Sequence, residues 1–273
     1  MKWIFALRYL VSRSSHSIIN IIAAISVVSV AVPIAAMIIL LSVFNGFERL
    51  VLDMYADVDA DIEIRATVSN DISPLLTADD ENRATIIGTE GVSEASFAIE
   101  HLALAEYGSR QCVVRVRGVD EHYFDVLAMD DYAVQGEVSA RLGELERAIV
   151  SHDAAQALGL YTAFGAQLKL YSLGGGEVGS MLPLRGLRSD HITVGGIVRS
   201  TNVFTQTILV PLSTAQRLFG RERANVIFIK GDGEGRVSAT TESLREIAGE
   251  GATVLTRDEK NTIFYTVMRY EKW

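Results

Sequence analysis

The stretch from Ile21 to Phe47, "IIAAISVVSVAVPIAAMIILLSVFNGF", contains no charged side chain, and this limits what the chain can fold into. The 27 residues from Ile18 to Phe44 reach roughly 40 Å as an α-helix at about 1.5 Å per residue. The hydrocarbon core of a bilayer is about 30 Å thick, so such a helix spans it with some tilt. The apolar core of a secretory signal peptide has only about 7–15 residues. We therefore predict a retained transmembrane helix over residues 16–47.

The charges on either side of this stretch predict its orientation. Before it stand Lys2, Arg8 and Arg13 with no acid, and "KWIFALRYLVSR" predicts an amphipathic helix at the inner membrane surface over residues 1–15. After it, Arg49 is outnumbered by acidic residues: Glu48, Asp53, Asp57, Asp59, Asp61 and Glu63. The positive-inside rule then places the N-terminus in the cytoplasm and the large remaining part outside.

Residues 48–260 read as an α+β domain. The helix is expected to continue as a stalk through "ERLVLDMYAD", and alternating strands and short helices follow, such as the strand "DIEIRA", a hairpin turning at Gly108 and a helix capped by Ser213. Everything after residue 13 carries 22 of the 25 basic residues and all 34 acidic ones, a net charge of −12. With no basic run, nucleic acid is not an expected partner. The predicted fold class is a membrane protein with one N-terminal transmembrane helix followed by an α+β domain of two lobes.

The sequence contains motifs that resemble catalytic or cofactor-binding patterns, but their spacing or context does not fit such a site. Ser151, His152 and Asp153 are adjacent, whereas a catalytic triad needs side chains that converge in space, so we interpret them as the start of a helix. The glycines at 174, 176 and 179 match a dinucleotide fingerprint, but no helix pattern follows them. The five histidines are scattered without metal-ligand spacing, and the single cysteine, Cys112, excludes an internal disulfide. We predict no catalytic residues, no metal and no cofactor in this chain.

One long connection stands apart. About eighteen residues separate the strand "AQLKLYS" from the strand "HITVGGIV", and their centre is apolar. Loops longer than about 12–15 residues are uncommon unless they are functional or disordered. Because an apolar tip suits the docking of a partner, Met181, Leu182, Pro183 and Leu184 are candidate docking residues.

Several segments resemble one family in order along the chain. "FALRYLVSR", "IIAAIS" and "LSVFNGFE" are similar to the opening of the lipoprotein-releasing ABC transporter permeases, the LolC/LolE family. "RVRGVDEHYFDV", "IVSHDAAQALGL", "TVGGIVRS", "LVPLSTAQRLFG" and "RDEKNTIFYTVMRYEK" resemble its periplasmic segments. The later segments are also similar to export permeases of the MacB type and to FtsX-like proteins.

The resemblance implies a transporter subunit and not an enzyme. Family members have four spans, so residues 261–273 would begin the second span and the chain would be the N-terminal half of a longer inner-membrane protein. ATP would be bound by a partner, a cytoplasmic ABC ATPase. The other implied partners are a second permease copy or paralogue, a periplasmic lipoprotein carrier and lipoproteins. The docking loop above occupies the position of a carrier-binding hook, and Val43, Phe44, Asn45 and Phe47 are candidates for lateral access of lipid or lipoprotein.

Other functions stay open at this point. Within transporters, the alternatives are a MacB-type export permease and an FtsX-like regulator of cell-wall hydrolases. In a different class, the chain would be a single-span periplasmic binding or signalling module. Small residues from Ala23 to Ala36, which allow another helix to approach closely, and the lack of a Gly or Pro stop after Arg257 count against that module.

Overall fold

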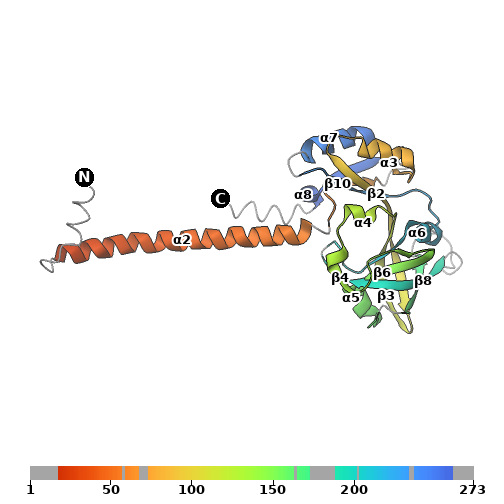
Figure 1. Ribbon diagram of the computed structural model, residues 1–273, viewed down its shortest axis with the longest axis horizontal. Helices are drawn as coiled ribbons and strands as arrows, with labels where there is room; N and C mark the ends of the chain where they lie inside the picture. The colour runs from red at the N-terminus through yellow and green to blue at the C-terminus, as the bar shows by residue number, and fades with distance from the viewer. Residues whose placement is uncertain are drawn as a thin grey trace, which may run out of the picture. The chain divides into compact units, whose positions relative to one another are not determined.

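The computed structural model describes residues 18–56, 59–67, 73–162, 165–172, 188–201, 203–233 and 237–260 (Figure 1). The chain forms two compact units, Met1–Tyr55 and Ala56–Trp273, which we call the helical unit and the α+β domain. Three predicted features lie outside the described residues: the amphipathic helix over 1–15, the start of a second span over 261–273, and the docking residues Met181, Leu182, Pro183 and Leu184.

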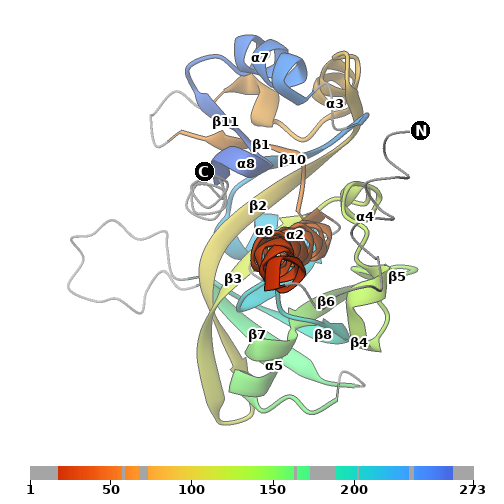
Figure 2. The ribbon, with the colours of Figure 1, turned by 90° about the vertical axis from the view of Figure 1, so that its left-hand side faces the viewer.

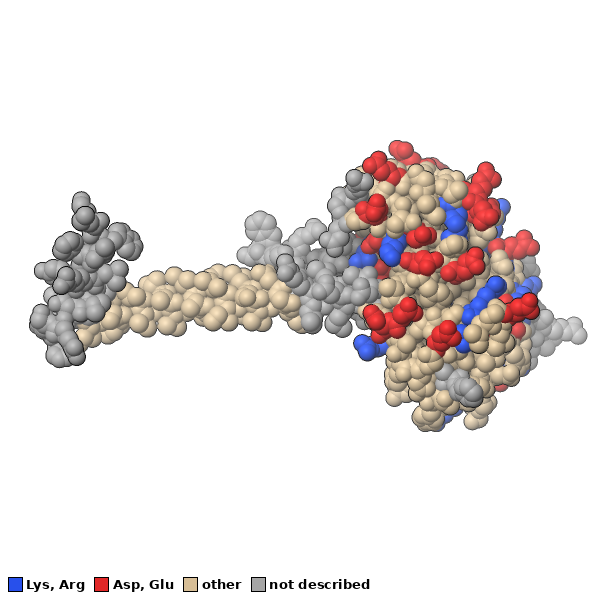
Figure 3. All heavy atoms as spheres, in the orientation of Figure 1, with Lys and Arg blue, Asp and Glu red and all other residues tan. Residues whose placement is uncertain are grey.

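Helix α2 runs from Ile18 to Ala56. Within the part of the chain that the structure describes, it holds one segment long and apolar enough to cross a membrane, Ile21–Phe47. Every residue of that segment is exposed, and the visible surface of the helix carries no charged side chain there (Figure 3). Pro33 lies inside the helix, which continues on both sides of it. The helix also continues past Phe47 for nine residues, as the stalk prediction expected.

The α+β domain contains strands and short helices. The strands are β1 (Ile62–Ala66), β2 (Val92–Tyr107), β3 (Arg110–Val119), β4 (Ala133–Gly136), β5 (Arg141–Leu142), β6 (Leu145–Ser151), β7 (Gln167–Ser172), β8 (Ser189–Val198), β9 (Thr207–Pro211), β10 (Val226–Gly231) and β11 (Ala252–Thr256). The helices are η1 (Pro74–Leu76), α3 (Asp80–Ile87), α4 (Tyr123–Val126), η2 (Asp130–Tyr132), α5 (His152–Leu158), α6 (Leu212–Phe219), α7 (Val237–Ala248) and α8 (Arg257–Lys260). The α+β fold class predicted from the sequence is confirmed.

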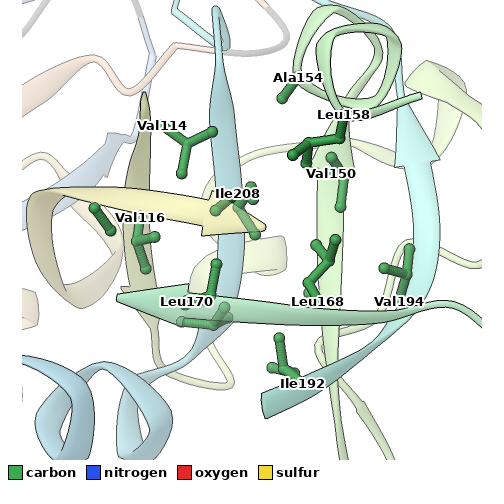
Figure 4. Close-up of a cluster of buried hydrophobic side chains, with 14 of the residues drawn as sticks. Val114, Val116, Val150, Ala154, Leu158, Leu168, Leu170, Ile192, Val194 and Ile208 are labelled. Atoms are coloured by element: carbon green, nitrogen blue, oxygen red, sulfur yellow. The ribbon is translucent and has the colours of Figure 1, made fainter. Parts of the chain in front are cut away.

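The strands pair in the order β11-β1-β10-β2-β3-β9-β6-β8-β4, and β5 pairs with β6. Strand β7 pairs with both β2 and β8, which closes β2, β3, β9, β6, β8 and β7 into a ring. Most neighbours are antiparallel, but β3–β9 and β6–β8 are parallel. The ring encloses apolar side chains from β3, β6, β7, β8 and β9, covered by Ala154 and Leu158 of helix α5 (Figure 4).

Strand β2 is shared by two lobes of the domain. Its first half pairs with β10 and its second half with β3 and β7. Figure 2 shows β2 and β3 as a long twisted ribbon that runs from the end with α3 and α7 to the end with α5. A separate apolar core, which includes Ile62, Ile64 and Leu244, fills the lobe of β1, β10 and β11. A third core at the junction of the lobes includes Tyr123, Phe204 and Phe228.

Local sequence explains most helix ends. Helices α5 and α6 stop at Gly159 and Gly220, whose positive φ angles of 69° and 64° favour glycine because it has no Cβ. The prediction that Ser213 caps α6 is wrong, because the residue at that position of the helix is Pro211. The hydroxyl of Ser213 instead donates a hydrogen bond to the carboxylate of Glu146 on β6 at 2.5 Å. This tertiary contact replaces the capping bond that the local sequence predicts.

Candidate functional site

The residues predicted for lateral access of lipid lie on the exposed surface of α2. Val43 and Phe47 are four positions apart and therefore share one face of the helix, and both are more than half exposed. Phe44 and Asn45 are exposed as well. A contiguous apolar surface of this kind is stable in lipid and costly in water. The role of these four residues in lipid access stays a prediction.

The first and the last described segments of the α+β domain are neighbours in the structure. Strand β1 follows α2 after a short connection, and β11 leads directly into α8. The two strands are antiparallel neighbours in which Ile62 lies opposite Thr256. One position further, the amide of Arg257 donates to the carbonyl of Asp61 at 3.0 Å. The segments that lead into and out of the domain therefore lie side by side.

Charged side chains join these two segments. The Arg257 guanidinium pairs with the Asp61 carboxylate at 2.7 Å and donates to the carbonyl of Asp59 at 2.9 Å. The Lys260 ammonium pairs with Asp59 at 2.5 Å and also with Glu63. We call Asp59, Asp61, Glu63, Arg257 and Lys260 the base cluster.

Burial makes the base cluster sensitive to loss of a partner. The side chains of Asp59 and Glu63 are each 1% exposed, and that of Lys260 is 19% exposed. A buried carboxylate without a counter-charge destabilises a fold by several kcal/mol, commonly about 3–5 when one partner of a buried pair is removed. The two acids therefore hold the first turn after β11 against the start of β1.

A chain of charges leads from the base cluster toward the junction of the lobes. Glu63 pairs with Arg65 at 2.9 Å, and Arg65 pairs with Glu100 of β2 at 3.2 Å. Glu100 in turn pairs with Arg117 of β3 at 2.7 Å, and Arg117 donates to the Tyr123 hydroxyl at 2.8 Å. We call Arg65, Glu100, Arg117 and Tyr123 the charge chain. It connects β1, β2, β3 and α4.

Arg117 is the inner end of this chain and its side chain is 1% exposed. Its guanidinium carbon lies 5.3 Å from the centre of the Phe204 ring and 4.7 Å from that of Phe228, within reach of cation–π attraction. Burial would lower the pKa of Arg117, but Tyr123 and Glu100 raise it, so the side chain stays charged. The positive charge therefore sits inside the junction core.

The surroundings of Glu100 and Tyr123 shift their pKa values in opposite directions. Burial by itself would raise the pKa of Glu100, but Arg117, Arg65 and Arg115 outweigh it and lower the pKa to about 2. Burial raises the pKa of Tyr123 to about 12, although Arg117 acts against it. At neutral pH Glu100 is therefore an anion and Tyr123 a neutral hydroxyl, which matches their bonds to Arg117.

The motif at Ser151–Asp153 is structural, as predicted. Ser151 precedes α5, and its hydroxyl oxygen accepts from the amide of Thr207 at 2.9 Å. Asp153 accepts from the Ser200 hydroxyl at 2.6 Å and from the amide of Gln206 at 2.7 Å. Gln206 has a φ of 45°, a rare angle for a residue other than glycine, so these bonds fix a strained turn before β9.

Two surface hollows of about 470 Å³ and 540 Å³ contain charged groups that pair with one another. Arg83 and Asp120 lie 2.5 Å apart in the first, and Arg217 and Glu146 lie 2.6 Å apart beside the second. Over the residues that the structure describes, no group of three or more His, Cys, Asp or Glu side chains is placed to hold a metal ion. The base cluster of the α+β domain and the apolar surface of α2 are therefore two separate candidate sites.

The comparisons with known proteins decide the family. A family model, the MacB-like periplasmic core domain, matches residues 23–247. The chain belongs to this family. The match includes much of the apolar segment of α2 and most of the α+β domain, so the MacB/FtsX-type permease family expected from the sequence is confirmed. A search of curated proteins finds no match.

Solved structures of MacB-type domains share the fold. One is the extracellular domain of the noncanonic ABC-type transporter YknZ from Gram-positive bacteria, with 16% sequence identity and a TM-score of 0.50, covering 71% of this chain and 99% of that chain. Another is the periplasmic region of MacB from Actinobacillus actinomycetemcomitans, with 14% identity and a TM-score of 0.51, covering 78% of this chain and 95% of that chain. At this identity the likeness establishes the fold.

Family and fold together identify an ABC transporter permease of the MacB/FtsX type, a membrane protein with an extracellular domain. MacB/FtsX-type permeases work with a cytoplasmic ATPase. The base cluster lies where the described part of the α+β domain begins and ends.

Sequence patterns did not point to the base cluster or to Arg117. The acids Asp59, Asp61 and Glu63 were interpreted as charges that orient the span, and no role was assigned to Arg117. Arg115 is exposed, but Arg117, two positions later in β3, is buried because the aromatic rings of the junction core cover it. The one available signal was the run of three acids at alternate positions directly after the stalk.

Proposed function

We propose that this chain is the transmembrane permease subunit that releases lipoproteins from the inner membrane to a soluble periplasmic carrier, driven by ATP hydrolysis in a separate subunit. The N-terminus is cytoplasmic and the α+β domain periplasmic. The permease pairs with a second copy or a paralogue, and it carries no cofactor of its own. The opening segments "FALRYLVSR" and "LSVFNGFE" support the lipoprotein branch of the family.

One observation carries the proposal: an uncharged helical segment that is exposed at every position precedes a stalk and a large folded domain in the sequence. A lipoprotein is held by its acyl chains, each buried CH₂ contributing about 0.8 kcal/mol. Its release is therefore uphill and requires work from elsewhere. Val43, Phe44 and Phe47 offer apolar contact to acyl chains, and Asn45 offers a polar side chain at the same level of the helix.

Site-specific photo-crosslinking tests this proposal. A photoreactive residue at Val43, Phe44 or Phe47 of the full-length complex is expected to form an adduct with a lipoprotein in the membrane. Ile25 is the matched control, because it is similarly exposed on the same helix but lies near its other end. The same cargo without its lipid should give no adduct. Absence of an adduct at all three positions contradicts the proposed access route.

A MacB-type export permease is the second candidate, because the family model that matches is named for that type. An exporter of peptides or small molecules has no need of a lipoprotein carrier. Affinity capture with the full-length permease separates the two: retention of a lipoprotein carrier supports release, and ATP-dependent export of a soluble substrate without any carrier supports the alternative. An FtsX-like regulator would instead retain a cell-wall hydrolase.

A further inference from the structure

The base cluster lies at the open end of the β1–β11 pair, at the edge of the sheet. Strand β11 forms one edge of the sheet and has β1 as its strand neighbour. Both the segment from α2 and the segment that continues into α8 leave this pair at the same end, at Ile62 and Thr256. Any force that separates the two segments therefore acts first on the last hydrogen bonds of the pair.

A force that separates the two strands of an antiparallel pair at one end opens the pair from that end. The hydrogen bonds lie perpendicular to the strands, so a separating force at one end breaks them one after another and never loads them all together. Helix α7 supports β11 from one side: Leu244 and Ala248 lie in the lobe core, and Arg245 pairs with Glu259 of α8 at 2.9 Å. This ion pair attaches α8 to α7 and not to β1, so a force that separates Ile62 from Thr256 still acts on the strand pair and on the base cluster.

The charges of the base cluster reinforce the strand pair at this end. The Arg257–Asp61 pair occupies the first position beyond the strands, where a side-chain ion pair and a backbone hydrogen bond join the same two residues. Lys260 lies one turn further along and binds the buried Asp59 and Glu63 together. Hydrogen bonds between charged groups are about twice as strong as neutral ones, and burial excludes competing water.

We propose that the base cluster is a clamp that holds the incoming and outgoing segments together, so that movement of the membrane part displaces the whole α+β domain. This inference rests on the proposed function, since it assumes ATP-driven movement of the helices. Opening the clamp would let the ATPase turn over while β11 separates from β1. The clamp therefore sets how much cargo is moved for each ATP consumed.

A reversible covalent clamp provides the test. Asp61 and Arg257 follow directly on the last strand pair, Ile62 and Thr256, and the amide of Arg257 donates to the carbonyl of Asp61 at 3.0 Å. Residues joined in this way across an antiparallel pair have Cα atoms about 5.5 Å apart, within the range that a disulfide requires. Asp61→Cys and Arg257→Cys are combined in the full-length permease with its ATPase in proteoliposomes, with Cys112→Ser to remove the native thiol. The same sample is measured reduced and then oxidised. Arg217→Gln, which breaks an ion pair on α6, is the matched control.

Two readouts are taken: lipoprotein released per ATP hydrolysed, and hydrogen exchange of the β11 amides. In the reduced form we expect release per ATP to fall about two- to thirtyfold, the range in which residues of a coupling network act. Exchange of β11 should become about tenfold faster, as expected for the loss of charged hydrogen bonds. Oxidation should restore both values, and Arg217→Gln should change neither. Unchanged exchange of β6 and β8 shows that the fold is retained.

The outcomes separate this inference from the proposed function. Equal release per ATP in the reduced and wild-type forms overturns the clamp, and so does a folded, oxidised form that stays uncoupled. If the wild-type complex releases no lipoprotein, the proposed function is wrong. The clamp is then tested only by hydrogen exchange of the β11 amides. Equal β11 exchange in the reduced, oxidised and wild-type forms then rejects it.

Discussion

At the scale of single residues, the pair of Glu100 and Arg117 is the least expected feature of the molecule. Both side chains are almost completely removed from solvent, and each is the nearest opposite charge of the other. Apolar residues of the same volume often stabilise a core as well as a buried ion pair does. The pair is therefore better explained by position: it continues the charge chain from the base cluster to the junction of the lobes.

Substitution of Glu100 should change how stability depends on pH. The folded pKa of Glu100 is lowered from 4.5 to about 2, so its ionised form stabilises the fold at pH values above about 4.5. This contribution, about 3 kcal/mol, is lost as the pH falls from about 4.5 toward 2. We expect Glu100→Gln to lower the free energy of unfolding at pH 7 and to match wild type more closely near pH 2. Urea unfolding at several pH values, followed by circular dichroism, measures this.

The control for that prediction is Glu250→Gln, because Glu250 is exposed. Its unfolding free energy should follow that of wild type at every pH. A Glu100→Gln variant whose difference from wild type is the same at pH 7 and at pH 3 would show that the carboxylate is not held ionised by Arg117, Arg65 and Arg115.

Residue roles were predictable only where they are local. Ser151 and Asp153 could be assigned to a helix start because the residues that define the helix are adjacent in sequence. Lys260 could not be assigned, since its partners Asp59 and Glu63 lie about 200 positions away and meet it only through the pairing of β1 with β11. Met181 to Leu184 stay a prediction, although Ser172 and Arg188, which flank the loop, are joined by a backbone hydrogen bond of 2.9 Å.

At the scale of elements, helix α6 shows how tightly the ring of strands is covered. A Cβ added to Gly118 of β3 would lie 2.1 Å from the Cβ of Ala215 on α6. Real Cβ atoms do not approach so closely, so the helix is seated where only glycine allows it. The segments "RVRGV" and "LSTAQRLFG", which resembled one family in the sequence, meet at this contact.

Gly118→Ala should therefore displace α6 from β3. We expect a loss of about 1–3 kcal/mol in the free energy of unfolding, the usual cost of overpacking a core. The matched control is Gly231→Ala on β10, where the nearest atom to the added Cβ would be 3.5 Å away. Thermal unfolding of both variants followed by circular dichroism compares them. A Gly118→Ala variant as stable as Gly231→Ala would contradict the close packing of α6.

The elements were largely predictable, but their closure into a ring was not. Helix α3 is capped by Asp79 before it and by Gly88 after it, and the β2–β3 hairpin turns at Gly108 as predicted. The pairing of β7 with both β2 and β8 depends on contacts between distant strands, which leave no local periodic pattern. The short strands β4 and β5 were missed because four and two residues are too few to show alternation.

At the scale of the whole molecule, the chain combines a helix that contains a long uncharged segment with a charged, folded domain. The acidic excess follows the apolar segment and the basic residues precede it, which predicts a cytoplasmic N-terminus. The MacB-type family places such domains outside the cytoplasm, in agreement with that asymmetry. Orientation is therefore a prediction that a labelling experiment can test directly.

Tyr161 is 82% exposed on the α+β domain, so Tyr161→Cys in a Cys112→Ser background provides an accessible thiol. A membrane-impermeant maleimide should label it in intact spheroplasts. Ser14→Cys, located before the span in the sequence, should be labelled only after the membrane is permeabilised. Labelling of Ser14→Cys and protection of Tyr161→Cys in intact spheroplasts would mean the opposite orientation.

The central claim is that energy from a separate ATPase is transmitted through this permease to move a lipid-anchored protein out of the membrane. Reconstitution of the full-length permease with its ATPase and a lipoprotein in proteoliposomes tests it most directly, by measuring lipoprotein transferred to a soluble carrier. The account predicts transfer that requires ATP hydrolysis and stops with a non-hydrolysable analogue. Transfer at the same rate without ATP, or ATP hydrolysis with no transfer to any carrier, would contradict it.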